Sequence, residues 1–234
     1  MGTLQQLAND IWIADGDIVD FYGFPYPTRC VVVRLADGGL WVWSPIALTS
    51  GLRAEIEQLG QPAHLVSPNK IHHLYLQDWH AAYPEARLWG PQSTISKRTD
   101  LAFEAPLEDN PPEVWRQDID QAWFRGSGFL DEIVLFHRAS QTAIIADMSE
   151  NFTEDFLRRH WSAWKRWIAR VWGIVEGKGY APLEVRWSFL SKGSLRAARD
   201  KVLGWNPRRV VMAHGRIQEN GGRSYLAKAF EWIG

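Results

Sequence analysis

The sequence predicts an α/β fold, because strand and helix patterns alternate along the whole of its 234 residues. Short apolar and β-branched runs, such as residues 30–35, are typical of buried strands. Between such runs, apolar residues recur at intervals of three and four, as they do across residues 49–59, which is typical of helices. A chain of this length can bury a large core without disulfides.

The composition excludes several classes of protein. With 26 Lys and Arg against 27 Asp and Glu, the formal net charge is −1, so no nucleic-acid partner is expected, since phosphate binding needs a clustered basic excess. The single cysteine, Cys30, excludes an internal disulfide framework and a cysteine-based zinc cluster. No run of about 18 apolar residues occurs, so no transmembrane segment is expected.

We expect a cytoplasmic protein, because the first ten residues have neither the basic part nor the apolar part of a signal peptide. No internal repeat and no shift in composition marks a boundary, so residues 1–234 are expected to form a single domain. The chain has 14 tryptophans against 3 methionines, and we expect most of these rings to pack in the core rather than to line a ligand pocket.

In the N-terminal third, Asp37-Gly38-Gly39 stands between two apolar runs and predicts a hairpin turn. Residues 49–59 predict a helix that begins at a Ser50 cap and has Leu52 and Ile56 on one face. The strands expected in this part of the chain are residues 11–14, 30–35, 40–43 and 63–67.

Further along, a loop at 68–73 precedes a helix of about ten residues that ends at Tyr83. Residues 104–113 are rich in proline and acidic residues, which indicates an exposed loop. The remaining expected strands are 87–90, 122–124, 132–137, 143–146 and 209–213, and the remaining helical segments are 92–97, 194–203 and the residues after Gly222.

Residues 153–175 show the clearest helical pattern, with Trp164, Trp167 and Val171 at intervals of three and four. Five Lys and Arg residues occupy the other positions. A basic amphipathic helix that bears tryptophans can lie on a membrane surface. The alternative, which we expect here, is a helix packed on the domain with its arginines in solvent.

Polar residues with metal-binding chemistry stand directly after three of the expected strands. They are His72 and His73 after the strand at 63–67, Asp147 after the strand at 143–146, and His214 after the strand at 209–213. In α/β sheets, sites form in the loops beyond the strand ends, and imidazoles with a carboxylate suit Zn, Fe or Mn. We therefore predict that His72 or His73, Asp147 and His214 converge. Taken singly, each residue can instead begin or cap a helix, or lie buried with a hydrogen-bond partner.

Five short motifs occur in a fixed order over nearly the whole chain. They are Ser44-Pro45, Pro68-Asn69-Lys70-Ile71-His72-His73, Phe136-His137-Arg138-Ala139-Ser140, Ile145-Ala146-Asp147 and Ala213-His214-Gly215. With these motifs the chain resembles the metallo-β-lactamase-like hydrolases, and more closely an uncharacterised branch catalogued as a domain of unknown function. The resemblance implies a four-layer αβ/βα sandwich, in which two mixed sheets lie face to face with helices on both outer faces.

Members of that superfamily carry His-x-His-x-Asp-His after a strand, and this chain has a degenerate form of the motif. Pro68 and Lys70 stand where the first two histidines would be, and Ser127 stands at the position of a third. Ser44 replaces the acid that normally ends the second hairpin strand. The resemblance therefore implies that one of two metal sites is lost.

The resemblance assigns the remaining site to His72, His73, Asp147 and His214, which implies one divalent ion such as Zn, Fe or Mn. Four protein ligands would fill a tetrahedral ion, whereas three leave a position for water. Asp147 would then be both a ligand and a catalytic base partner. The Lys70 ammonium could take the vacant cation position and stabilise an oxyanion, replace the lost charge structurally, or be a solvated loop residue.

Two functions are consistent with these observations. The first is a mononuclear metal-dependent hydrolase of a small ester, thioester, lactone or amide. The second is a non-catalytic member of the fold that binds a ligand or a partner. We expect a small-molecule substrate or ligand, and no nucleotide cofactor, because neither a Walker nor a Rossmann glycine pattern is present.

Overall fold

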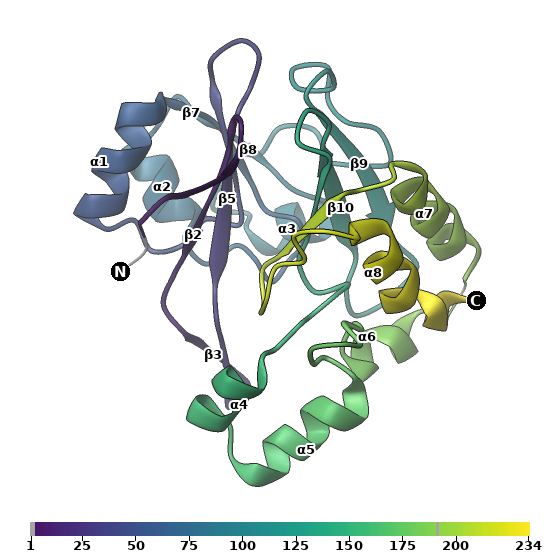
Figure 1. The fold of residues 1–234 in the computed structure, drawn as a ribbon. Coiled ribbons are helices and arrows are strands. Elements are labelled where there is room, and N and C mark those ends of the chain that lie inside the picture. The colour runs from purple at the N-terminus through teal and green to yellow at the C-terminus, as the bar shows by residue number, and fades with distance from the viewer. Residues whose placement is uncertain (1–2, 191) are drawn as a thin grey trace.

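The computed structural model describes residues 3–190 and 192–234 and has two large β-sheets packed face to face, with helices on both outer sides (Figure 1). This is the four-layer αβ/βα arrangement that the sequence analysis predicts. A separate two-stranded sheet, β3 (Val19–Phe21) with β4 (Phe24–Tyr26), lies at one end of the molecule near α4.

The first large sheet has six strands in the order β1-β2-β5-β6-β7-β8. Their bounds are Gln5–Ala8, Ile11–Asp15, Arg29–Arg34, Leu40–Trp43, Pro62–Val66 and Arg87–Trp89. The strands from β1 to β6 pair antiparallel, and the predicted hairpin between β5 and β6 is confirmed. From β6 to β8 the pairing is parallel, because α1 (Ser50–Leu59) and α2 (Leu76–Ala82) lie between these strands in the chain.

The second large sheet has four strands in the order β12-β11-β10-β9. Their bounds are Arg209–Met212, Thr142–Ile145, Glu132–His137 and Ile119–Phe124. The pairs β9–β10 and β10–β11 are antiparallel, and β11 is parallel to β12. Because β11 and β12 are parallel, their carboxyl ends, which carry Asp147 and His214, meet at the same edge of the sheet.

Buried side chains of both sheets meet in the space between them. Trp41, Trp43 and Trp115 are fully buried there against residues such as Leu135 and Val211 of the facing sheet. Successive side chains of a strand point to opposite faces of its sheet, so alternate residues of each strand face the layer between the two sheets. Most of the remaining strand residues face the outer helices, so both faces of each sheet are covered.

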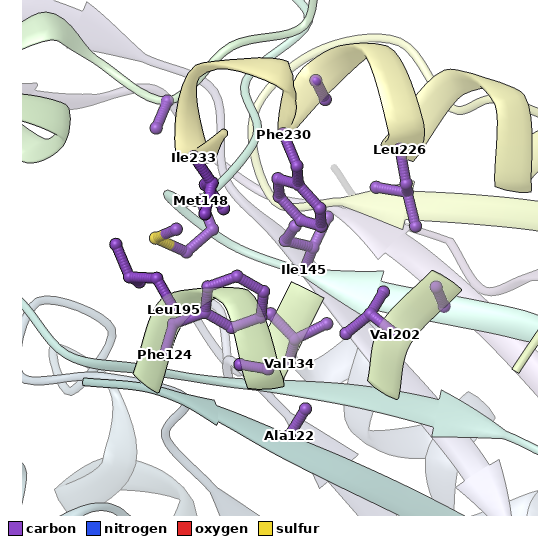
Figure 2. Packing of buried hydrophobic residues seen from close by; sticks show 14 of the residues in the cluster. Ala122, Phe124, Val134, Ile145, Met148, Leu195, Val202, Leu226, Phe230 and Ile233 are labelled. Carbon is purple, nitrogen blue, oxygen red and sulfur yellow. The ribbon is translucent and has the colours of Figure 1, made fainter. Parts of the chain in front are cut away.

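Helices bury their apolar faces on the outer sides of the two sheets. α1 and α2 place Leu52, Ile56 and Trp79 on the six-stranded sheet. On the four-stranded sheet, Figure 2 shows the side chains of α7 (Gly193–Gly204), α8 (Gly222–Ala229) and the short helix η1 (Glu231–Ile233) packed on strand residues. Phe124 and Phe230 are among the fully buried rings of this layer, with centroids 5.2 Å apart.

The prediction of one helix over residues 153–175 is wrong in one respect. This segment forms two helices, α4 (Glu154–His160) and α5 (Ala163–Trp172). The break lies at Trp161, whose backbone is extended (φ −113°, ψ 134°). The buried Trp161 indole donates to the Pro25 carbonyl at 2.8 Å, which draws the side chain into the core and turns the chain. Residues of both helices pack against the β3–β4 hairpin.

Several smaller boundaries also differ from the sequence prediction. Thr49 rather than Ser50 caps α1, because the Thr49 hydroxyl accepts from the backbone N–H of Leu52 at 3.2 Å. α2 has seven residues rather than about ten. The helical turn at α3 (Gln92–Lys97) is confirmed, whereas β1, β3, β4 and α6 (Leu183–Ser188) are elements that the sequence pattern did not indicate. Within residues 3–190 and 192–234, no helix is both long and apolar enough to cross a membrane.

Candidate metal centre

Three side chains from separate loops meet at the edge between the two large sheets. His72 lies in the loop after β7, Asp147 in the loop after β11, and His214 in the loop after β12. One donor atom from each residue lies within 4.8 Å of the other two. The sequence prediction that one of the two adjacent histidines converges with Asp147 and His214 is therefore met by His72.

Both imidazoles direct Nε2 towards the Asp147 carboxylate. The Nε2 atom of His72 is 3.4 Å from Oδ2, and the Nε2 atom of His214 is 3.4 Å from Oδ1. Their opposite nitrogens are held, since His72 Nδ1 lies 2.7 Å from the Ser44 hydroxyl and His214 Nδ1 lies 2.7 Å from the Pro27 carbonyl. A carbonyl only accepts, so His214 Nδ1 donates to Pro27 and Nε2 is the ring nitrogen that faces the carboxylate.

The two Nε2 atoms and the carboxylate are placed so that one cation could bind between them. The His72 Nε2 atom is buried and has no hydrogen-bond partner within residues 3–190 and 192–234, which is costly for a polar atom. A separation of 3.4 Å is too long for a charge-assisted hydrogen bond, which measures about 2.7–2.9 Å. A tetrahedral ion with bonds of about 2.0–2.1 Å holds neighbouring donors roughly 3.3–3.4 Å apart. The residues present therefore fit one divalent ion.

Asp147 is held by two buried polar residues, Glu132 of β10 and Asn69 of the loop after β7. Glu132, at the start of β10, accepts the backbone N–H groups of Ala146 and Asp147, each at 2.7 Å, and of Met148 at 3.1 Å. The Asn69 amide donates to Asp147 Oδ2 at 2.6 Å. Glu132 thus fixes the backbone of the loop after β11, and Asn69 fixes the carboxylate that this loop presents.

The two buried carboxyls, those of Glu132 and Asp147, differ in their pKa shifts. Burial and the nearby Asp147 charge raise the pKa of Glu132, although its three backbone donors act in the other direction. Burial also opposes ionisation of Asp147, but the imidazoles of His72 and His214 outweigh it and hold the Asp147 pKa below its usual value. Asp147 therefore ionises more readily than Glu132, and the ionised carboxylate is the form that binds a metal.

The loops after β11 and β12 are joined to each other beyond the site. The backbone N–H of Asn151 donates to the His214 carbonyl at 3.0 Å, and the N–H of Arg216 donates to the Asn151 carbonyl at 2.9 Å. Between them, Gly215 has a φ of 105°, and a Cβ added there would lie 2.1 Å from the Asn151 carbonyl oxygen. Only glycine permits this close approach, which fixes the position of His214.

His72, Asp147 and His214 line a cavity of about 340 Å³. The β3–β4 hairpin forms one wall with Val19, Phe21 and Tyr26, and α6 contributes Val185. Three further acids, Asp20, Glu150 and Glu184, also line it. Burial and the Asp147 charge raise the pKa of Glu150, whose carboxyl accepts from the Tyr26 hydroxyl at 3.4 Å.

The other two predicted site residues, His73 and Lys70, lie outside the His72–Asp147–His214 group. Of the four predicted metal ligands, three therefore converge. His73 lines the cavity but turns its Nδ1 to Arg98, 3.3 Å from Nη1, and the same guanidinium holds the His73 carbonyl at 3.0 Å. The Lys70 ammonium lies 5.7 Å from the centre of the Phe129 ring, and Lys70 is not among the residues of the cavity wall. Ser127 is hydrogen-bonded to the Ser188 hydroxyl at 2.5 Å and is also outside the wall.

Sequence reasoning missed Glu132, Asn69, Tyr26 and Glu150. Glu132 had a readable signal, because it is the one acidic residue in the otherwise apolar run 132–136. A charge within a buried strand needs partners, which indicates a structural or functional role. Tyr26 and Glu150 gave no signal, because their proximity depends on how the β3–β4 hairpin packs on the loop after β11.

A family model described as "Domain of unknown function (DUF4336)" matches residues 8–157, about two thirds of the chain. No curated protein matches the sequence. The matched residues include His72 and Asp147 and end before His214.

The structure is similar over its whole length to solved metallo-β-lactamases. DIM-1 metallo-β-lactamase has a TM-score of 0.65 and 12% identity, and the match covers 100% of this chain and 98% of that chain. The metallo-β-lactamase of Pontibacter korlensis has a TM-score of 0.64 and 10% identity, covering 100% and 99%.

A metal-soaked Flv1 flavodiiron core from Synechocystis sp. PCC6803 is similar as well, with a TM-score of 0.65 and 10% identity over 99% of this chain and 60% of that chain. Such low identities show a shared fold and not a shared activity. The chain thus belongs to the DUF4336 family of domains of unknown function, and its fold is that of the metallo-β-lactamase superfamily.

Proposed function

We propose that this protein is a mononuclear metal-dependent hydrolase that acts on a small ester, thioester, lactone or amide. One observation carries the proposal: two buried imidazole Nε2 atoms face the Asp147 carboxylate at 3.4 Å, and that of His72 has no hydrogen-bond partner in the described part of the chain. Imidazole and carboxylate ligands suit Zn, Fe or Mn.

The position of His73 supports a catalytic rather than a closed structural site. His73 is hydrogen-bonded to Arg98, so three protein ligands remain for the ion. Three protein ligands with one open position are typical of catalytic zinc sites, whereas four are typical of structural sites. An ion bound here would polarise a substrate carbonyl and lower the pKa of a coordinated water.

The chain's own residues would hold and orient the reactants. Ser44 and the Pro27 carbonyl fix the two imidazoles, and Asn69 fixes Asp147, which would also serve as the partner that accepts a proton from water. The cavity of about 340 Å³ lies at the small end of the range for ligand sites, roughly 300–1,000 Å³. It favours a small-molecule substrate.

A second candidate function is ligand binding without catalysis. It is favoured by Pro68, Lys70 and Ser127, which occupy the positions of the superfamily's other metal ligands and offer no imidazole. In this case the three converging residues would hold an ion or a ligand, and no hydrolysis would follow.

Calorimetric titration of the metal-free protein with Zn²⁺, Mn²⁺ or Fe²⁺ tests the metal site. We expect one equivalent to bind, and His72→Ala or His214→Ala to weaken binding at least about tenfold. His73→Ala is the matched control and should bind as the wild type does. Absence of binding, or an equal loss in His73→Ala and His72→Ala, would contradict the proposed site.

Hydrolysis assays of the metal-loaded protein then separate the two functions. Ester, thioester, lactone and amide substrates are compared in the wild type and in His214→Ala. Turnover that disappears in His214→Ala supports the hydrolase. Stoichiometric metal binding without turnover of any of the four classes favours the non-catalytic member.

A further inference from the structure

Large apolar side chains are exposed on α5 and α6, at one end of the molecule. On α5, Trp164, Trp167 and Val171 are 58%, 64% and 53% exposed, and on and after α6, Trp187 and Leu190 are 76% and 92% exposed. We call these five residues the tryptophan surface. The face of a helix that turns to water is normally polar, so large apolar side chains exposed on two helices at one end of the molecule indicate a partner.

The opposite side of α5 already packs on the protein. Ala169 is fully buried with the β3–β4 hairpin residues in the same cluster, and Trp172 packs against that cluster. The exposure of Trp164 and Trp167 is therefore not explained by a helix that packs loosely on the protein. The sequence analysis expected a helix packed on the domain. One face of α5 packs in this way, and the face with Trp164 and Trp167 does not.

Basic residues accompany the tryptophan surface. Residues 154–190 hold seven Lys and Arg against four Asp and Glu, a net charge of +3, in a chain whose net charge is −1. The Lys165 ammonium lies 5.5 Å from the centre of the Trp164 ring and 5.0 Å from that of Phe24. The β3–β4 hairpin at the same end carries the acid Asp20, whereas α5 carries Lys165, Arg166 and Arg170 and no acid, so the positive charge is concentrated on the helix that exposes Trp164 and Trp167.

One helix of the tryptophan surface, α6, also lines the cavity. α6 contributes Pro182, at its N-cap, and Val185 to the cavity wall, and the same helix exposes Trp187. The cavity rim is also apolar, since Tyr22 is 86% exposed and Leu74 is 56% exposed. Figure 1 shows β3, α4, α5 and α6 together at this end of the molecule.

We propose that this end docks on the surface of an anionic lipid bilayer, with the cavity mouth towards the lipid. Indole rings prefer the boundary between headgroups and acyl chains, where an apolar ring and a polar N–H are both accommodated. Lysine and arginine beside them are attracted to anionic headgroups. A second copy of this chain fits less well, because two surfaces of net positive charge repel.

Co-sedimentation of the full chain with lipid vesicles tests this surface. Vesicles of phosphatidylcholine alone are compared with vesicles that also contain phosphatidylglycerol. We expect binding to the anionic vesicles, weaker binding to the neutral ones, and a loss of binding as salt is raised. The double variant Trp164→Ala/Trp167→Ala should bind at least about tenfold more weakly.

Val114→Ala is the matched control, because Val114 is 40% exposed and lies outside the tryptophan surface. It should bind vesicles as the wild type does. Urea unfolding of each variant checks that it remains folded. We expect that both do, because the substituted side chains are exposed. The proposal is overturned if the wild type binds neither vesicle, if the double variant binds undiminished, or if the tryptophan surface instead mediates a dimer without vesicle binding.

Discussion

His72 and His73 are neighbours in the chain, yet only His72 faces Asp147. The Ser67 hydroxyl donates to the His72 carbonyl at 2.9 Å, and the Asn69 side chain accepts from the backbone of Ile71 at 2.8 Å. These bonds fold the loop so that successive side chains point apart. The sequence predicted that this pair supplies a ligand, but the choice between them depends on loop hydrogen bonds that no periodicity encodes.

Glu132→Gln tests how Asp147 is positioned. The substitution turns one acceptor oxygen into a donor that faces the backbone N–H groups of Ala146, Asp147 or Met148. We expect the free energy of unfolding to fall by about 2 kcal/mol, because buried donors lose their acceptor. Urea denaturation measures the change.

Glu113→Gln is the control for this substitution. Glu113 pairs with Arg116 at the surface, where its side chain is 76% exposed, and a change within about 0.5 kcal/mol is expected. Equal effects of the two substitutions would show that Glu132 is not the support of the loop after β11.

His64 predicts a pH dependence of stability that is independent of the metal centre. Burial and the nearby Arg87 lower the pKa of His64 to about 4, and its Nδ1 accepts from the Trp89 indole at 3.1 Å. The unfolded chain has a His64 pKa near 6.5, so below that pH it binds more protons than the folded chain, and stability falls as the pH falls.

His64→Asn removes this titration and keeps an acceptor oxygen for Trp89. Between about pH 7 and about pH 4.5, we expect the wild type to lose about 2 kcal/mol of unfolding free energy relative to His64→Asn. Urea unfolding at several pH values measures the difference. A difference that stays constant over this range would mean that His64 is not held neutral in the core.

At the scale of elements, the site depends on loops that follow neighbouring strands. Because β11 and β12 are parallel, the loops after them lie side by side and hydrogen-bond to each other through Asn151. This part was predictable, since acids and imidazoles directly after apolar runs lie at strand ends. The division of residues 153–175 into two helices was not predictable. It depends on the hydrogen bond from Trp161 to Pro25, and these residues are 136 positions apart in the chain.

Gly215→Ala tests the contact between these two loops. The added Cβ would lie 2.1 Å from the Asn151 carbonyl oxygen, at a φ of 105° that disfavours side chains. We expect a loss of at least about 2 kcal/mol in unfolding free energy, together with weaker zinc binding, because His214 must shift.

Gly128→Ala provides the comparison for Gly215→Ala. A Cβ at Gly128 meets no atom within 4 Å, so this substitution should leave both stability and zinc binding close to those of the wild type. If Gly215→Ala behaved in the same way, the loops would not depend on their close approach.

At the scale of the whole molecule, the alternation of strands and helices was enough to predict the α/β class, and the resemblance to the metallo-β-lactamase-like hydrolases implied the four layers. What the sequence left open was the position of short or irregular elements. The β3–β4 hairpin has three residues in each strand, too few for a readable alternation, yet it forms a wall of the cavity. The exposure of the tryptophans on α5 was one of two alternatives and not the expected one, since an indole in an apolar pattern predicts burial.

Crystals of the zinc-loaded protein, measured at the zinc absorption edge, test the account most directly. We predict one anomalous peak, bonded at about 2.0–2.2 Å to the Nε2 atoms of His72 and His214 and to an oxygen of Asp147, with the fourth position open to solvent. His73 should remain beside Arg98. No peak between these three residues, or a peak with His73 as a ligand, would contradict the proposed mononuclear site.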